Sequence, residues 1–314
     1  MKLLTALAAL ATAAIAVAGS ASAQDVLRFG VVPKAMNNPF FDLVRDGCQA
    51  RAAELGGIEC VYLGPVEHES ATQAQIIDDL ITQGVDGLAI SVLDAAAAET
   101  AVAKATAAGI PVITFDSGQG LPGAASYVGT DNKLFGLELG KALVTLQPAG
   151  GQWGAISGGA GAPNLAERVD GVREALQGSA WTEVPGSPTF SNDDIALAVQ
   201  QAADLRTANP DLKAIVPVGG WPMFAPDGWK NFVDPFKADV DSKAFMLVVA
   251  DTLPQQLELL KQGYAHALVG QRPYEMGEKS MDTLLALTKG ETVDPIVYTG
   301  VDVVTADNVD EFLK

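Results

Sequence analysis

Short apolar runs alternate with longer amphipathic stretches along most of this chain. The apolar runs are rich in β-branched residues and are bounded by glycine, proline or polar residues, which is typical of buried strands. The stretches between them repeat apolar residues at helical spacing, as in residues 70–84 and 164–178. Because strand, helix and strand follow one another, the pattern predicts an α/β fold with parallel sheets and right-handed crossovers.

The alternation forms two series of similar length. Residues 24–314 are more than one hydrophobic core comfortably holds, so two domains are expected. No low-complexity linker separates the series, which favours a short hinge between two doubly wound parallel-sheet lobes. The expected strands are 26–32, 60–64, 87–92 and 111–116 in the first series and 151–157, 188–190, 214–220 and 245–251 in the second.

The first expected helix begins with two consecutive phenylalanines. Asn38 can cap this helix, and Pro39 suits its first turn because proline has no N–H to leave unpaired. Phe41 starts an apolar face that continues at helical spacing to Leu55. Phe40 lies roughly 100° around the helix from Phe41, so the two rings cannot serve the same face. One ring therefore has a role outside the core.

Residues 1–23 have the pattern of a secretory signal peptide. Lys2 precedes an apolar run over residues 3–18, and small residues follow up to Ala23. A membrane anchor is the alternative, but the run is short for a span of about 20 residues. We expect cleavage before Gln24 and a soluble protein in the periplasm.

Charge and composition exclude several classes of partner. Without residues 1–23 the chain has 19 basic and 38 acidic side chains, a formal charge of −19. Such a surface repels nucleic acids and anionic lipids. Two histidines and two cysteines leave little material for a metal site or a Cys/His catalytic pair, so we expect neither a metal nor a cofactor.

The two cysteines lie close together in the expected fold. Cys48 is on the first helix, and Cys60 begins the next strand. In an oxidising compartment they can form a disulfide that closes a short loop. Two buried thiols are the alternative.

Several expected strands end in a polar or aromatic residue. In open α/β sheets a ligand binds beyond the carboxyl ends of the strands, so these positions are candidates for a binding site. For any single one of them, a turn signal or a helix cap is an equally good explanation. The positions are Pro33 and Lys34, Asp116, Phe190, Gly219 to Trp221, Asp251 and Gln271.

Six short motifs resemble the periplasmic binding proteins of sugar ABC transporters, in the ribose-binding-like group of the type I fold. The resemblance extends over nearly all of the chain after residue 23. The motifs are NNPFF from residue 37, GIPVITFDS from 109, GTDN from 129, ERVDG from 167, VVAD from 248 and GQRPYEMG from 270.

The resemblance implies two lobes between which the chain crosses three times. The crossings should fall near Gly129, Gln271 and Gly300. The N-terminal lobe would hold residues 24–129 with 272–299, and the C-terminal lobe would hold residues 130–271 with 300–314.

The resemblance also implies a function. Such a protein captures a sugar or polyol in the cleft between its lobes and delivers it to a membrane ABC permease, as a monomer. Asn38 would then form a hydrogen bond to the ligand, and Phe40 or Phe41 would stack on its ring face while the other serves the core. Asp116 would accept two hydroxyls, and Arg168 would donate a planar fork of hydrogen bonds.

The second lobe would supply three further contacts. Phe190 would form a wall, Asp251 would accept another hydroxyl, and Gln271 would make a contact beside the hinge. Carboxylates, a guanidinium and aromatic rings suit the hydroxyls and flat C–H faces of a sugar. The alternative for Arg168 is a solvated helix residue near Glu167.

Departures from the ribose binders leave the ligand open. Gly219 and Gly220, followed by Trp221, stand where those proteins carry an Asn-Asp pair, and Ser117 stands in place of an arginine. Lys34 replaces a small hydroxyl residue and either contacts the ligand or forms a salt bridge at the rim of the cleft. The VPK piece that ends at Lys34 and the DS piece that ends at Ser117 are more similar to the autoinducer-2 and rhamnose-type branch. A pentose, hexose, deoxy sugar or polyol remains possible.

Three other functions are alternatives. A periplasmic sensor that presents a sugar or an autoinducer-2-like signal to a membrane receptor is compatible with the same site. A glycosidase-like enzyme could use Asp116 and Asp251 as a carboxylate pair, but no nucleophile or metal motif accompanies them, so we expect no catalytic residues. Sugar-responsive repressors share the fold but need a basic helix-turn-helix where this chain has its apolar N-terminus.

Overall fold

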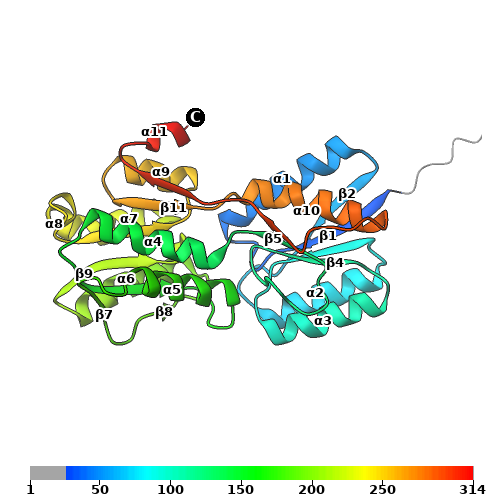
Figure 1. Cartoon of the computed structure of the whole chain (residues 1–314), viewed down its shortest axis with the longest axis horizontal. Coiled ribbons are helices and arrows are strands. Elements are labelled where there is room, and N and C mark those ends of the chain that lie inside the picture. The colour runs from blue at the N-terminus through cyan, green and yellow to red at the C-terminus, as the bar shows by residue number, and fades with distance from the viewer. Residues whose placement is uncertain (1–25, 314) are drawn as a thin grey trace, which may run out of the picture.

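The computed structural model describes residues 26–313, so the expected signal peptide lies outside the described residues. Two α/β lobes lie side by side along the longest axis of the molecule (Figure 1). Each lobe is a sheet with helices on both faces, as the alternation of strands and helices predicts. The α/β fold with two mainly parallel sheets is therefore confirmed. In the described part of the chain, no helix has the length and apolar character that crossing a membrane requires.

The first lobe contains a six-stranded sheet in which every neighbouring pair is parallel, in the order β12-β5-β4-β3-β1-β2. Helices α1 and α10 pack together on one face, and α2 and α3 pack on the other (Figure 1). The strands are β1 (Leu27–Val32), β2 (Ile58–Tyr62), β3 (Gly87–Ile90), β4 (Val112–Phe115), β5 (Tyr127–Gly129) and β12 (Ile296–Tyr298). The helices are α1 (Pro39–Leu55), α2 (Ser70–Thr82), α3 (Ala95–Ala107) and α10 (Pro273–Thr288).

The second lobe contains a seven-stranded sheet in the order β13-β11-β10-β9-β6-β7, with β8 paired to β6. Its edge strand β13 runs antiparallel to β11, which the sequence pattern did not predict. The strands are β6 (Gly151–Ser157), β7 (Trp181–Glu183), β8 (Thr189–Phe190), β9 (Leu212–Pro217), β10 (Met246–Ala250), β11 (Ala267–Gly270) and β13 (Asp302–Thr305). The helices are α4 (Asn132–Leu146), α5 (Pro163–Ala175), α6 (Ile195–Ala208), α7 (Pro226–Val233), α8 (Lys237–Asp241), α9 (Pro254–Lys261) and α11 (Val309–Phe312).

Three segments connect the two sheets, after β5, after β11 and after β12. Hydrogen bonds join these segments, because the Thr299 N–H donates to the Gly129 carbonyl at 2.9 Å and the Thr130 hydroxyl donates to Gln271 at 3.0 Å. Gly300 has a φ of 90°, a conformation that favours glycine. The three segments thus form one hydrogen-bonded hinge.

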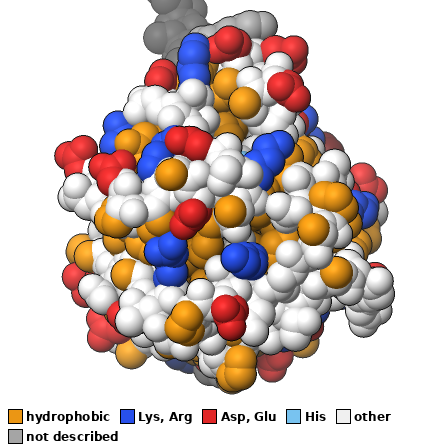
Figure 2. All heavy atoms as spheres, turned by 90° about the vertical axis from the view of Figure 1, so that its left-hand side faces the viewer, with side chains coloured by type: hydrophobic (Ala, Val, Ile, Leu, Met, Phe, Trp, Pro, Cys, Tyr) orange, Lys and Arg blue, Asp and Glu red, His pale blue; other side chains and the backbone are white. Residues whose placement is uncertain are grey.

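The outer end of the second lobe mixes both signs of charge. Figure 2 shows acidic, basic and apolar side chains interspersed on this face. Ion pairs such as Arg206–Asp239 and Lys261–Asp310 hold basic groups beside acidic ones in this lobe. This face is therefore not uniformly acidic, although the net charge of the chain is −18.

Asn38 and Pro39 start helix α1 as the sequence predicts. The Asn38 Oδ1 atom accepts a hydrogen bond from the Phe40 N–H at 3.0 Å. The rings of Phe40 and Phe41 are both buried and meet edge to face, with centroids 5.2 Å apart. Phe41 also contacts Phe115 edge to face, at 6.3 Å between centroids. Phe41 is therefore anchored in the core.

Cys48 of α1 and Cys60 of β2 are joined by a disulfide, with Cα atoms 6.0 Å apart. We expect thiol counting on the denatured, unreduced protein to find no free thiol. Reduction should lower the free energy of unfolding by about 3 kcal/mol, because the bond closes a short loop in the unfolded chain. A reduced sample, which should give two thiols, is the control. Two thiols before reduction would contradict this prediction.

Candidate functional site

A small cavity lies between the two lobes, at the carboxyl ends of strands from both sheets. One of its lining residues, Gln271, lies on the hinge segment after β11, at the edge of the second lobe. The first lobe contributes Lys34, Asn38, Phe40, Phe41 and Asp116, and the second contributes Asn164, Leu165, Arg168, Asp193, Gly219, Trp221, Asp251 and Gln271.

The two lobes each place an aspartate in the cavity directly after a central strand. Asp116 follows β4 with a φ of 57°, and Asp251 follows β10 with a φ of 69°. Non-glycine residues adopt this left-handed conformation rarely, and it concentrates at functional sites. The backbone N–H groups of both residues are hydrogen-bonded to the neighbouring strand, which holds the conformation. Both carboxylates are buried.

Lys34 forms a buried ion pair with Asp116 and a hydrogen bond across the cleft. Its Nζ atom lies 3.2 Å from Asp116 Oδ2 and donates to Asn164 Oδ1, in the other lobe, at 2.9 Å. The Ser91 hydroxyl donates to the same Asp116 oxygen at 2.7 Å. The other oxygen, Oδ1, lies 4.0 Å from a terminal nitrogen of Arg168. Asp116 Oδ1 is therefore the oxygen available to a ligand hydroxyl.

Arg168 is a buried residue of α5 and not a solvated one. Its guanidinium lies 4.4 Å from the centroid of the Phe135 ring. Nε donates to Asn132 at 2.8 Å, one terminal nitrogen donates to the Val218 carbonyl at 3.1 Å, and the other donates to Gln271 at 2.6 Å. Three of its five N–H groups are thus used inside the protein, which leaves two for a ligand.

Gln271 connects Arg168 to Asp251. The Gln271 Nε2 atom donates to Asp251 Oδ1 at 2.7 Å, and the Gly220 N–H donates to Asp251 Oδ2 at 2.9 Å. Burial raises the pKa of the Asp251 carboxyl, although the positive charge of Arg168 and these two hydrogen bonds act in the opposite direction. The chain from Arg168 to Asp251 fixes the orientation of all three side chains.

Aromatic side chains from both lobes complete the cavity. Phe40 and Phe41 both line it from the first lobe, and Phe41 also packs against Phe115 in the core. Trp221 lines it from the second lobe, where it begins a short 3₁₀ turn after Gly220.

Three residues expected at the site do not line this cavity. Phe190 is 43% exposed and instead borders a separate hollow beside α5. Ser117 is buried beside Asp116, and its hydroxyl has no hydrogen-bond partner among the described residues. Gly220 contributes its N–H to Asp251, while its neighbour Gly219 forms the wall.

The cavity also contains residues that were not expected. Asn164 lies four residues before Arg168 on α5, so helical spacing alone could have pointed to it. Asp193 reaches the cavity through a turn in which Asn192 and Asp193 have φ values of 51° and 60°. The same turn separates Asp193 from Phe190, which stays at the surface. Nothing in the sequence beyond a turn signal marks Asp193.

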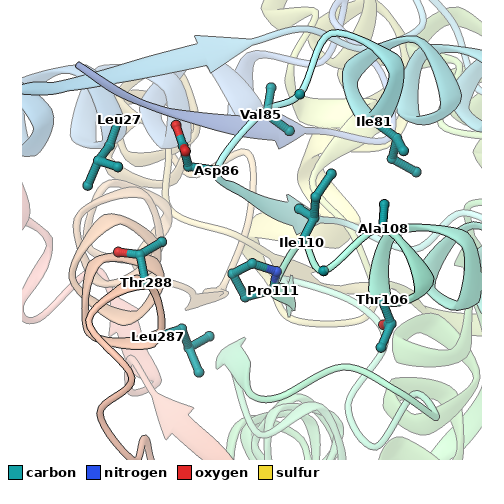
Figure 3. Close-up of a pocket in the computed structure, with 12 residues that line it drawn as sticks. Leu27, Ile81, Val85, Asp86, Thr106, Ala108, Ile110, Pro111, Leu287 and Thr288 are labelled. Atoms are coloured by element: carbon teal, nitrogen blue, oxygen red, sulfur yellow. The ribbon is translucent and has the colours of Figure 1, made fainter. Parts of the chain in front are cut away.

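A larger hollow lies at the opposite end of the first lobe. It is bordered by the first residue of β1, by the residues just before β3 and β4, and by the ends of α2, α3 and α10 (Figure 3). Its one charged lining residue, Asp86, already accepts a hydrogen bond from the Arg28 N–H at 2.7 Å. Because it lacks converging polar groups and lies away from the carboxyl ends of the strands, it is a weaker candidate.

Comparisons with known proteins agree with this architecture. The chain is 30% identical over 292 residues to the ribose import binding protein of Salmonella typhimurium, covering 93% of this chain and 94% of that protein. It is 25% identical to the D-allose-binding periplasmic protein of Escherichia coli, covering 88% of this chain and 89% of that one.

Solved structures give the same result. A solute-binding protein from Burkholderia graminis in complex with D-arabinose has a TM-score of 0.83 at 31% identity, covering 92% of this chain and 98% of that one. One from Agrobacterium vitis with bound D-fucose has a TM-score of 0.84 at 28% identity, covering 90% and 97%. The periplasmic binding protein domain model matches residues 29–292. The expected family is thus confirmed, and the chain belongs to the periplasmic binding proteins.

Proposed function

We propose that this protein is the solute-binding component of an ABC transporter, and that it captures a sugar or polyol between its two lobes. The observation that carries this proposal is the closed cavity itself. It brings a carboxylate from each lobe, Asp116 and Asp251, together with aromatic rings from each lobe. A ligand that contacts both sides stabilises the closed arrangement by its higher affinity for that state.

The free hydrogen-bonding groups of the cavity match a polyhydroxylated ligand. Asp116 Oδ1 accepts a hydroxyl, and the two unused N–H groups of Arg168 donate to hydroxyl oxygens. The Asn38 amide nitrogen is free of the helix cap, which uses only Oδ1. Phe40 and Trp221 offer flat apolar faces to the C–H groups of a sugar ring. We infer a ligand no larger than a monosaccharide, because little open space remains between the lobes.

The relatives support the same class of ligand. Their names and bound molecules include ribose, allose, D-arabinose and D-fucose, and each of these proteins aligns with nearly the whole chain. We therefore propose a pentose, hexose or deoxy sugar. The four sugars differ, so the comparison sets the class of ligand and not its identity.

The remaining functional assignments are also proposals. We infer that the protein is not an enzyme, that it acts in the periplasm after loss of residues 1–23, and that as a monomer it delivers its ligand to a membrane permease. Its relatives are binding proteins of import systems, which supports these assignments. The lobe boundaries at residues 129, 271 and 300 likewise remain a prediction, supported by the exchange of strands between the two sheets.

A thermal-shift screen against pentoses, hexoses, deoxy sugars and polyols tests the proposal. A true ligand at about 100 times its Kd should stabilise the native state by about 2.7 kcal/mol, which raises the Tm by roughly 5 °C for a chain of this size. Maltose, a disaccharide, is the control and should have no effect, because it exceeds the cavity. If no sugar or polyol raises the Tm while amino acids do, the proposed ligand class is wrong.

A further inference from the structure

His68 joins the two lobes at the border of the cavity. It lies in the loop between β2 and α2 of the first lobe, outside the set of residues that line the cavity. Its Nδ1 atom is 2.7 Å from Oδ2 of Asp193 in the second lobe. The side chain of Asp193 is 4% exposed and that of His68 is 15% exposed, so water competes little for this contact. The hydrogen bond can exist only when the lobes are closed.

Asp193 is positioned to act in the cavity as well as with His68. Oδ2 faces the imidazole, while Oδ1 packs against Gly158, where any Cβ atom would overlap it. The same Cβ would lie 2.8 Å from the ring of Trp221, which lines the cavity. Asp193 therefore bridges the cavity wall and the contact between the lobes.

The second lobe has a glycine-rich loop that receives His68. This loop, residues 158–161, connects β6 to α5. A Cβ atom at Gly159 would overlap the imidazole of His68, and the three atoms nearest to it all belong to that ring. At Gly161, a Cβ atom would lie 3.1 Å from Asp94 Oδ2 of the first lobe. The loop thus lets side chains of the first lobe seat directly against its backbone.

We propose that His68 is a positioning residue that latches the closed cleft by donating a hydrogen bond to Asp193. An imidazole that carries its proton on Nδ1, whether neutral or charged, can make this bond. The bond holds the Asp193 carboxylate at the cavity wall and is lost when the lobes separate. This proposal rests on the proposed function only in assuming that the lobes open and close, and it requires no particular sugar.

The test measures closure without any ligand. Asp94→Cys and Gly161→Cys place one thiol on each lobe, close enough to pair when the lobes are closed, because a Cβ atom at position 161 lies 3.9 Å from Cγ of Asp94. The native disulfide already occupies the other two cysteines. With oxidised glutathione in excess, the rate of cross-linking reports the fraction of time that the lobes are closed.

We expect His68→Ala to slow this cross-linking about tenfold, which is the contribution of a charge-assisted hydrogen bond. His68→Asn should restore most of the rate, because its amide nitrogen occupies the place of Nδ1. Glu67→Ala, an exposed change on the same loop, is the control and should keep the parent rate. The Tm of every variant should stay close to that of the parent.

Gly159→Ala independently tests whether His68 packs against the glycine-rich loop. With His68 present it should slow cross-linking, because the new methyl group displaces the imidazole. In the His68→Ala background it should have no further effect, since the overlapping atoms are gone. An unchanged rate in His68→Ala, or a parent that never cross-links, would overturn the latch. Because no sugar is present, that outcome is distinct from failure of the thermal-shift screen.

Discussion

Replacing Asp251 by alanine is expected to weaken sugar binding at least tenfold while the protein remains folded. The carboxylate is the second lobe's buried acceptor opposite Asp116, and a charge-assisted hydrogen bond is typically worth roughly 1.5–3 kcal/mol. Its loss also frees Gln271 and the Gly220 N–H from their partner. The second lobe then holds the ligand less well, and the closed state is populated less.

The protein should remain folded, because burying the charged carboxylate of Asp251 costs free energy. Burial raises the pKa of its carboxyl, so removing the charge relieves part of that cost and offsets the lost hydrogen bonds. Calorimetry with the sugar identified in the thermal screen measures the affinity. Asp211→Ala, an exposed change in the same lobe, is the matched control. If Asp251→Ala binds as tightly as the parent, the site does not extend to the second lobe as we propose.

The fold could be predicted from the sequence, because the alternation of apolar strands and amphipathic helices determines an α/β arrangement. Apolar strands such as Val112–Phe115 and Met246–Ala250 are buried on both faces, so they appear as continuous apolar runs. Where that pattern is weak, the prediction was incomplete. The motif at the start of α10 did not by itself predict a helix there. The edge strand β13 is short and partly exposed, so no clear sequence pattern indicated its antiparallel direction.

The candidate site was predictable mainly at residues that end a strand or follow it closely. Lys34, Asp116, Asp251 and Gln271 lie one or two residues after a strand, and all four line the cavity. Phe190 is the last residue of β8, but it stays at the surface. Whether such a residue reaches the cavity depends on how the two lobes pack, which the local sequence pattern does not encode.

Hydrogen-bond partners are a further limit of sequence reasoning. Arg168 could be placed near a ligand by its motif, but its three protein acceptors come from three different elements. The latch residue His68 is similarly 125 positions away from Asp193 in the chain. Such contacts follow from the packing of the lobes, and no periodic pattern in the sequence indicates them.

Replacing Arg168 by methionine is expected to lower the free energy of unfolding by about 3–5 kcal/mol. The change removes one partner from a buried charged network and leaves the carboxylates of Asp116 and Asp251 without their shared cation. It also removes the donor to Asn132 and to the Val218 carbonyl, and it leaves Gln271 Oε1 with the Thr130 hydroxyl as its donor. Methionine can still pack on the Phe135 ring, so the loss reports polar contacts rather than a cavity.

The pH dependence of this loss distinguishes the network from simple packing. The positive charge of Arg168 lowers the pKa of Asp251, so the variant should raise that already elevated pKa further. A carboxyl with a raised pKa in the folded state binds protons more readily there than in the unfolded chain, and stability falls as pH rises through that range. The destabilisation should therefore be larger at pH 7.5 than at pH 5.

Urea unfolding at the two pH values gives the measurement, and two further variants make it specific. Arg168→Lys should rescue little, because an ammonium cannot reach three acceptors with the planar geometry of a guanidinium. Arg173→Met, on the same helix, removes an exposed pair with Glu183 and should cost at most about 1 kcal/mol. If Arg168→Met costs no more than Arg173→Met, or costs the same at both pH values, then Arg168 does not hold the two carboxylates in place. The cavity would then owe its geometry to the backbone turns at Asp116 and Asp251 alone.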